Sequence, residues 1–111
     1  MGNRLWTALA LAVGLASPAH ANSSEGKVKS LVVRASDGLH YVVIESAFSG
    51  RAACAANTSY YMIVDEHSDA GKAQLAILLS AYMSGKSVLI EGSGTCTRWT
   101  DGEDILVVLL R

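Results

Sequence analysis

The chain has 111 residues, half of them hydrophobic, and a formal net charge of −1 at pH 7. Its length allows one small domain. No basic stripe or cluster stands out, which argues against a nucleic-acid partner because phosphate binding needs concentrated positive charge.

The first segment, Met1 to Ala21, has the pattern of a secretory signal peptide. Arg4 supplies a positive start, residues 5–16 form an apolar run, and Ala19-His20-Ala21 is a small-residue cleavage signal. The run is too short for a stable bilayer span. We therefore expect residues 1–21 to be removed and the protein to be periplasmic or secreted. The alternative is an uncleaved membrane anchor.

The segment after the cleavage site, Asn22 to Gly26, is polar and is predicted to be a flexible leader. Residues 27–111 then form the single domain. Residues 27–34 and 40–46 predict two strands, and the Ser36-Asp37-Gly38 turn between them predicts a hairpin.

A loop rich in Ala, Ser and Gly follows at residues 47–57, and a third strand is predicted at residues 58–64. Side chains alternate across a strand, so Tyr60 and Tyr61 are expected on opposite faces. One of them should be in the core and the other outside.

Residues 68–85 predict the only internal helix. Ser68 or Asp69 can cap its first turn, and Gly85 stands where a left-handed glycine ends a helix. The apolar side chains recur with helical spacing: Leu75, Leu78, Leu79, Tyr82 and Met83. The first four are expected to hold the barrel together.

Two further strands are predicted, at residues 87–91 and 105–110, the second apolar on both faces and therefore central or closing. The order is β-β-β-α-β-β. This order favours an all-β, five-stranded barrel with one helix, the oligonucleotide/oligosaccharide-binding fold (OB-fold). The alternative is an open antiparallel sheet covered by the helix.

Cys54 and Cys96 are the only cysteines. In an exported protein an even pair predicts a disulfide, worth about 4 kcal/mol by the chain-entropy model. The alternative is a pair of metal ligands, but no histidine or further cysteine stands at ligand spacing, so no metal site is predicted.

Acidic residues gather in two places without the spacing of a known site. Residues 65–69 are interpreted as a solvated helix start, where acids are favoured by the helix dipole. Residues 101–104 lack the spacing of a calcium loop and are interpreted as a turn. No nucleophile elbow, phosphate-binding loop or dinucleotide fingerprint is present, so neither an enzyme nor a cofactor is predicted.

Trp99 lies beside Arg98 in the loop between the fourth and fifth predicted strands, a recurrent binding loop of OB-folds. An exposed aromatic side chain at this position would stack on a sugar or anchor a protein partner. The alternative is that Trp99 folds back over the disulfide.

The order and spacing of several motifs resemble those of a family of small exported bacterial proteins, the subtilase cytotoxin B-subunit-like family. These motifs are residues 29–33 and 41–45 around the hairpin turn, and the helix end and following strand at residues 82–88, with a glycine-x-cysteine after it. The resemblance covers most of residues 27–110 and implies an OB-fold. For the toxin members it implies a homopentamer that binds sialylated glycans.

The resemblance also assigns positions. The toxin members use a first-strand serine for sialic acid, and Ser30 stands at that position. The positions of a family glutamine and a family tyrosine hold Phe48 and Gly92, so these polar contacts lack counterparts.

We therefore expect a small exported binding module for a glycan or for an envelope or host protein. The candidate binding residues are Ser30, Phe48 and Trp99. The alternative is a structural or interaction protein of the bacterial envelope, with neither a glycan site nor catalytic activity.

Overall fold

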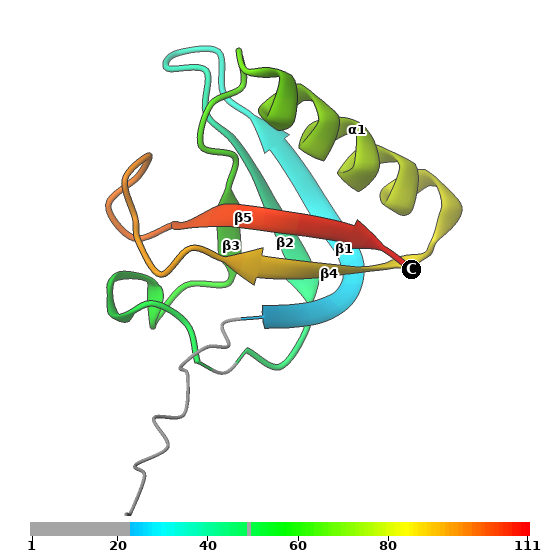
Figure 1. Ribbon diagram of the computed structural model, residues 1–111, viewed down its shortest axis with the longest axis horizontal. Helices are drawn as coiled ribbons and strands as arrows, with labels where there is room; N and C mark the ends of the chain where they lie inside the picture. The colour runs from blue at the N-terminus through cyan, green and yellow to red at the C-terminus, as the bar shows by residue number, and fades with distance from the viewer. Residues whose placement is uncertain (1–22, 49) are drawn as a thin grey trace, which may run out of the picture.

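The computed structural model describes residues 23–48 and 50–111 (Figure 1). Within these residues five strands close a barrel and one α-helix lies against it. The elements in chain order are β1 (Ser23–Val33), β2 (His40–Glu45), the 3-10 helix η1 (Ala53–Ala55), β3 (Tyr60–Met62), α1 (Asp69–Ser84), β4 (Ser87–Gly92) and β5 (Glu103–Leu110).

The strand order around the barrel is β1-β2-β3-β5-β4, with β4 pairing back onto β1. Neighbouring strands are antiparallel except β3 and β5, which are parallel. This arrangement confirms the predicted OB-fold-like barrel and excludes the open sheet. The disulfide between Cys54 and Cys96 is also confirmed.

The start of β1 contradicts the predicted flexible leader. Ser23 to Gly26 form strand rather than a loose tail, and they pair with β4 from Glu91 to Val88. Gly26 permits this path because a Cβ there would meet the backbone oxygen of Glu45. The polar residues gave no strand signal, since their order comes from pairing with a distant strand. The predicted signal peptide and Asn22 lie outside the described residues.

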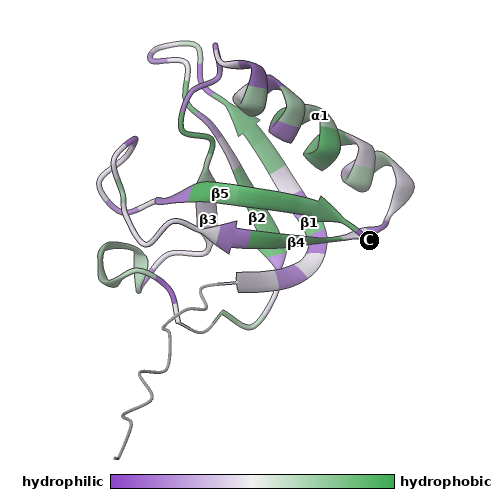
Figure 2. Cartoon of the chain, viewed as in Figure 1, coloured by the Kyte–Doolittle hydropathy of each residue, from purple (hydrophilic) through white to green (hydrophobic). Residues whose placement is uncertain are grey.

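The barrel interior is filled by alternate residues of the strands and by one side of α1, and Figure 2 shows hydrophobic residues along β5 and the second half of β1. The buried cluster comprises Val28, Val42, Ile44, Tyr61, Ile63, Leu78, Ala81, Val88, Ile90 and Ile105. Tyr61 is in the core whereas Tyr60 is on the outside, as the alternation predicts.

The helix contacts the barrel through a narrower face than its apolar stripe predicted. Leu78 and Ala81 are buried and Leu75 packs against the core. Leu79 and Tyr82, however, are 51% and 52% exposed. The first turn folds tightly onto the segment before it, because Gly71 has no side chain to collide with the backbone of Asp65. The contact is therefore centred on Leu78, and the expected packing role of Leu79 and Tyr82 is wrong.

The ends of α1 follow the sequence. The Ser68 hydroxyl accepts a hydrogen bond of 2.9 Å from the Gly71 N–H, and Gly85 ends the helix in the left-handed region at φ 70°. Strand β5 closes the barrel, but its outer face carries exposed Leu106 and Leu109. No helix in the described part of the chain is long and apolar enough to span a membrane.

Candidate functional site

The outer face of β1, β2 and β3 is the best candidate surface. The register aligns Ser30 with Val43 and Val43 with Tyr60, and it aligns Tyr41 with Met62 in the neighbouring row. Residues paired across strands share a face of the sheet. The sequence candidate Ser30 therefore shares an outer face with the tyrosines.

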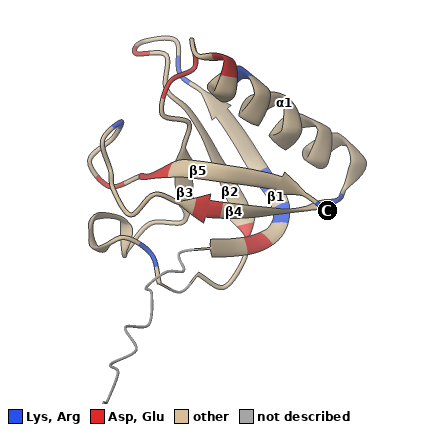
Figure 3. Cartoon of the chain, in the orientation of Figure 1, with Lys and Arg blue, Asp and Glu red and all other residues tan. Residues whose placement is uncertain are grey.

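Two loops border one end of this face: residues 34–39 between β1 and β2, and residues 93–102 between β4 and β5. The guanidinium of Arg34 lies 4.8 Å from the ring centre of Trp99, joining the two loops. Arg34 Nη2 also donates to Asp37 Oδ2 over 2.6 Å. Both loops carry residues of both charge signs (Figure 3).

Between these loops is a hollow of about 70 Å³, which we call the aromatic hollow. Leu39 and Met62 form buried parts of its lining, and the rings of Tyr41 and Tyr60 are 5.2 Å apart at their centres. Gly102 packs directly against Met62, where a Cβ would collide. The complete lining is Arg34, Leu39, Tyr41, Tyr60, Met62 and Trp99.

Tyr60 is held in one protonation state at neutral pH. Burial and the hydrogen bond that its hydroxyl donates to Asp101 Oδ1 raise its pKa to about 12. The negative charge of Asp101 acts in the same direction, whereas a contact with Trp99 opposes it. Tyr60 is therefore a neutral wall of the hollow whose hydroxyl is already engaged.

A second arginine fixes the loop that carries Trp99. Arg98 donates from Nη2 to Glu66 Oε1 at 2.8 Å and from Nε to Glu66 Oε2 at 3.3 Å. It also donates to the backbone oxygen of Asp37 at 3.2 Å. The bond to Glu66 raises the pKa of Arg98 above its usual value. The contacts of Arg98 thus connect the β1–β2 loop, the segment before α1 and the β4–β5 loop.

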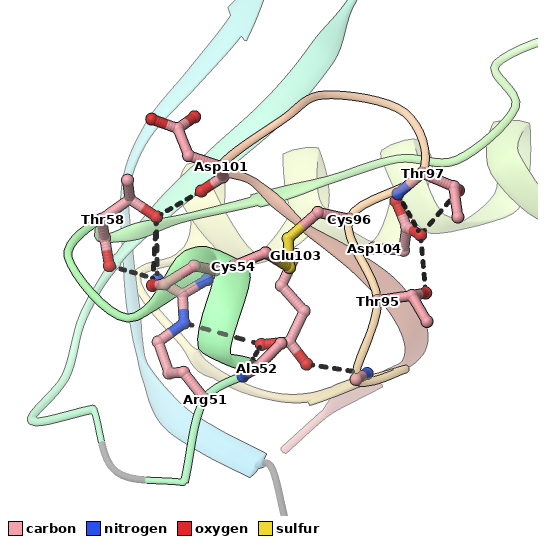
Figure 4. Close-up of a disulfide and its surroundings, with 12 residues drawn as sticks. Arg51, Ala52, Cys54, Thr58, Thr95, Cys96, Thr97, Asp101, Glu103 and Asp104 are labelled. Carbon is pink, nitrogen blue, oxygen red and sulfur yellow. Dashed lines mark hydrogen bonds and ion pairs between the residues drawn. A yellow bond between two sulfur atoms is a disulfide. The ribbon is translucent and has the colours of Figure 1, made fainter.

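The buried carboxylate of Asp104 also holds the β4–β5 loop in place (Figure 4). Its carboxylate accepts from the Thr95 hydroxyl, the Thr97 hydroxyl and N–H, and the Arg98 N–H, over 2.7–3.2 Å. Burial acts to raise the pKa of Asp104, but the hydrogen bonds outweigh it and the pKa is lowered. Trp99 therefore extends from a preorganised loop.

The acidic residues do not converge on a common centre. Asp101 accepts from Tyr60, Asp104 from the threonines, and Glu66 from Arg98. Asp65 accepts from the His67 N–H at the start of the helix. Each of these carboxylates is held by hydrogen bonds to its own neighbours, which favours structural roles for both acidic segments. No group of ligands for a metal ion is found among residues 23–48 and 50–111.

Phe48 belongs to a different region, which we call the buried arginine cluster: Phe48, Arg51, Tyr61 and Glu103. The guanidinium of Arg51 lies 4.9 Å from the ring centre of Phe48 and 4.4 Å from that of Tyr61. It donates to the backbone oxygens of Thr58 and Tyr60, and its Nε is 3.7 Å from Glu103 Oε1. Phe48 is thus partly buried against the core and does not line the hollow.

Glu103 is fully buried beside the disulfide (Figure 4). It accepts from the N–H groups of Ala52 and Gly94 at 3.1 and 3.0 Å. A Cβ at Gly92 would collide with its carboxylate. The structure therefore places Phe48 and Gly92 in or beside this cluster, while Ser30 faces Val43 on the outer sheet face.

Of the sequence candidates, Trp99 lines the hollow and Ser30 shares the adjoining sheet face. Arg34, Tyr41 and Tyr60 were missed. The two tyrosines could have been found from the sequence. Tyr41 alternates with buried Val42 and Tyr60 with buried Tyr61, so both rings are expected on the outer face of the sheet. Comparison with protein-family models, curated proteins and solved structures found no match.

Proposed function

We propose that this protein is an exported glycan-binding module and that the aromatic hollow is its binding site. The main support is the position of Trp99 in the β4–β5 loop of an OB-fold-like barrel. Trp99 is 37% exposed and lies against the guanidinium of Arg34. The loops at this end of the strand 2–3 face are where such barrels bind oligosaccharides and oligonucleotides. The absence of a basic cluster in the sequence favours the sugar.

The physical support is the combination of side chains. Exposed aromatic rings bind apolar surfaces, such as sugar faces, at low cost in conformational entropy, and charged groups beside them fix orientation by hydrogen bonds. Trp99 is held by Arg98 and by the loop bonds to Asp104, so little ordering is needed on binding. The disulfide and the signal-like residues 1–21 support export, and the resemblance to the binding components of these toxins supports glycan recognition.

The test is a glycan-array screen of oxidised protein spanning residues 22–111. We expect selective binding that Trp99→Ala abolishes. Val64→Ala serves as the matched control, because Val64 is an exposed apolar residue that does not line the hollow. Arrays without signal for the wild-type protein would contradict the proposal, as would equal binding by Trp99→Ala.

A second candidate function is protein association, including the homopentamer that the family resemblance implies. It is favoured by exposed apolar side chains on α1 and β5: Leu79, Tyr82, Met83, Leu106 and Leu109. These side chains lie on two neighbouring elements, and large exposed apolar patches mark interaction surfaces. Sedimentation analysis separates the alternatives. A ring of five that Leu109→Glu dissociates supports self-association, a monomer opposes it, and a monomer crosslinked on cells to one envelope protein supports a different partner.

A further inference from the structure

The size of the aromatic hollow restricts what it can hold. Its volume is about 70 Å³, whereas pockets that enclose whole small molecules measure roughly 300–1,000 Å³. The hollow therefore accommodates one substituent of a ligand, and the rest of that ligand must lie outside it.

The lining selects an apolar substituent. Leu39 and Met62 close its floor and are only 1% and 0% exposed. The walls that a ligand can reach are therefore the rings of Tyr41, Tyr60 and Trp99. The hydroxyl of Tyr60 is already engaged with Asp101. A polar group packed against the faces of these rings would lose its hydrogen bonds to water without gaining protein partners, which is unfavourable. A methyl group would instead gain contacts with the faces of these rings.

The rim supplies a donor for a neighbouring carbonyl. The guanidinium of Arg34 is partly exposed, and the hydrogen bond it makes within the described residues goes from Nη2 to Asp37. A guanidinium has five N–H donors, so other N–H groups of Arg34 are available at the edge of the hollow. A substituent with a methyl group inside and a carbonyl oxygen at the rim fits this arrangement.

We propose that the aromatic hollow binds the acetamido group of an N-acetylhexosamine. Its methyl group lies against the rings of Tyr41 and Tyr60, and its carbonyl oxygen accepts a hydrogen bond from Arg34. The sugar ring remains outside, beside Trp99. This inference rests on the proposed glycan-binding function and names the sugar class that the site selects.

The experiment compares glycans that differ only in an acetamido or a hydroxyl group at the same carbon. Suitable pairs are β-1,4-linked trimers of N-acetylglucosamine and glucose, and array glycans ending in N-acetylgalactosamine or galactose. We expect the acetamido member of a bound pair to bind at least about tenfold more tightly, the discrimination typical of one additional apolar group in a fitted pocket.

Equal affinity within the pairs overturns the acetamido inference but leaves glycan binding intact. Binding of no glycan on the array overturns the proposed function and this inference with it. The two failures are therefore distinguishable in the same measurement.

Two variants test the placement of the group. Tyr41→Trp extends a ring into the hollow and should remove the acetamido preference while binding of the hydroxyl members persists. Arg34→Gln, at a partly exposed position that folding tolerates, should reduce acetamido binding about tenfold. Lys29→Gln is the control, because Lys29 is an exposed base on the same strand and does not line the hollow. An unchanged preference in Arg34→Gln contradicts the proposal.

Discussion

Two regions of this barrel contain the same kind of contact, an arginine over an aromatic ring, in different surroundings. In the buried arginine cluster, Arg51 stacks on Phe48 and Tyr61, and its side chain is 4% exposed. At the aromatic hollow, Arg34 stacks on Trp99, and its side chain is 37% exposed. An arginine–aromatic contact therefore has no fixed role. Solvent access decides whether its donors are consumed by the fold or remain available to a ligand.

The largest expected difference is in stability. Arg51→Ala leaves Glu103 buried without this cation and leaves the carbonyls of Thr58 and Tyr60 without its donors, so we expect a loss of about 3–5 kcal/mol in the free energy of unfolding. Arg34→Ala removes a partly exposed ion pair and should cost less than about 1 kcal/mol. Urea unfolding of both variants makes the measurement. Equal losses would break the comparison.

The disulfide gives the next effect. Cys54 and Cys96 are separated by 42 residues, and replacing both with alanine should lower the free energy of unfolding by about 4 kcal/mol. The hollow should nevertheless persist in the folded fraction, because Arg98 and Asp104 hold the same loop independently. Urea unfolding measures the first effect. Ultraviolet titration measures whether Tyr60 keeps its raised pKa, and a return to an ordinary tyrosine value would contradict the second.

Asp104 holds the loop that borders the hollow, and its titration predicts acid sensitivity. Its pKa is lowered below 3.8 in the folded state, so its stabilisation is complete above the unfolded pKa of about 3.9 and is lost as the pH falls through the lower folded value. Asp104→Asn should cost about 1–3 kcal/mol at pH 7 and show a smaller loss on acidification. Unfolding at pH 7 and pH 3 is compared with exposed Glu91→Gln. The same acid dependence in both variants would refute the assignment.

The smallest effect concerns Tyr60. Its pKa is raised from 10.0 to about 12, so its contribution to stability is complete below pH 10 and is lost as the pH rises through about 12. Tyr60→Phe should cost about 1 kcal/mol at neutral pH and reduce this alkaline loss. Thermal unfolding between pH 7 and pH 11 measures it, with exposed Tyr82→Phe as the control. If Tyr82→Phe reduces the alkaline loss equally, Tyr60 is not the responsible group.

The sequence predicted the barrel and one member of its candidate site. The periodicities of residues 40–46 and 68–85 and the breakers between elements were sufficient for the element order, and Trp99 stood out in a binding loop. Ser23 to Gly26 could not be recognised as strand, because they are polar and gain their order from β4. Leu79 and Tyr82 were placed in the core because an apolar stripe does not show how wide the contact will be.

The order of strands and helix, the helix caps and the cysteine pair can all be predicted from the sequence. These depend on local periodicity, on single residues such as Ser68 and Gly85, and on there being only two cysteines. Which arginine is buried and which tyrosines line a hollow depend on how the strands and loops pack together. Arg34 and Arg51 have equivalent chemistry in the sequence. Closure of the barrel brings Glu103 to Arg51 and brings Trp99, across a loop open to solvent, to Arg34.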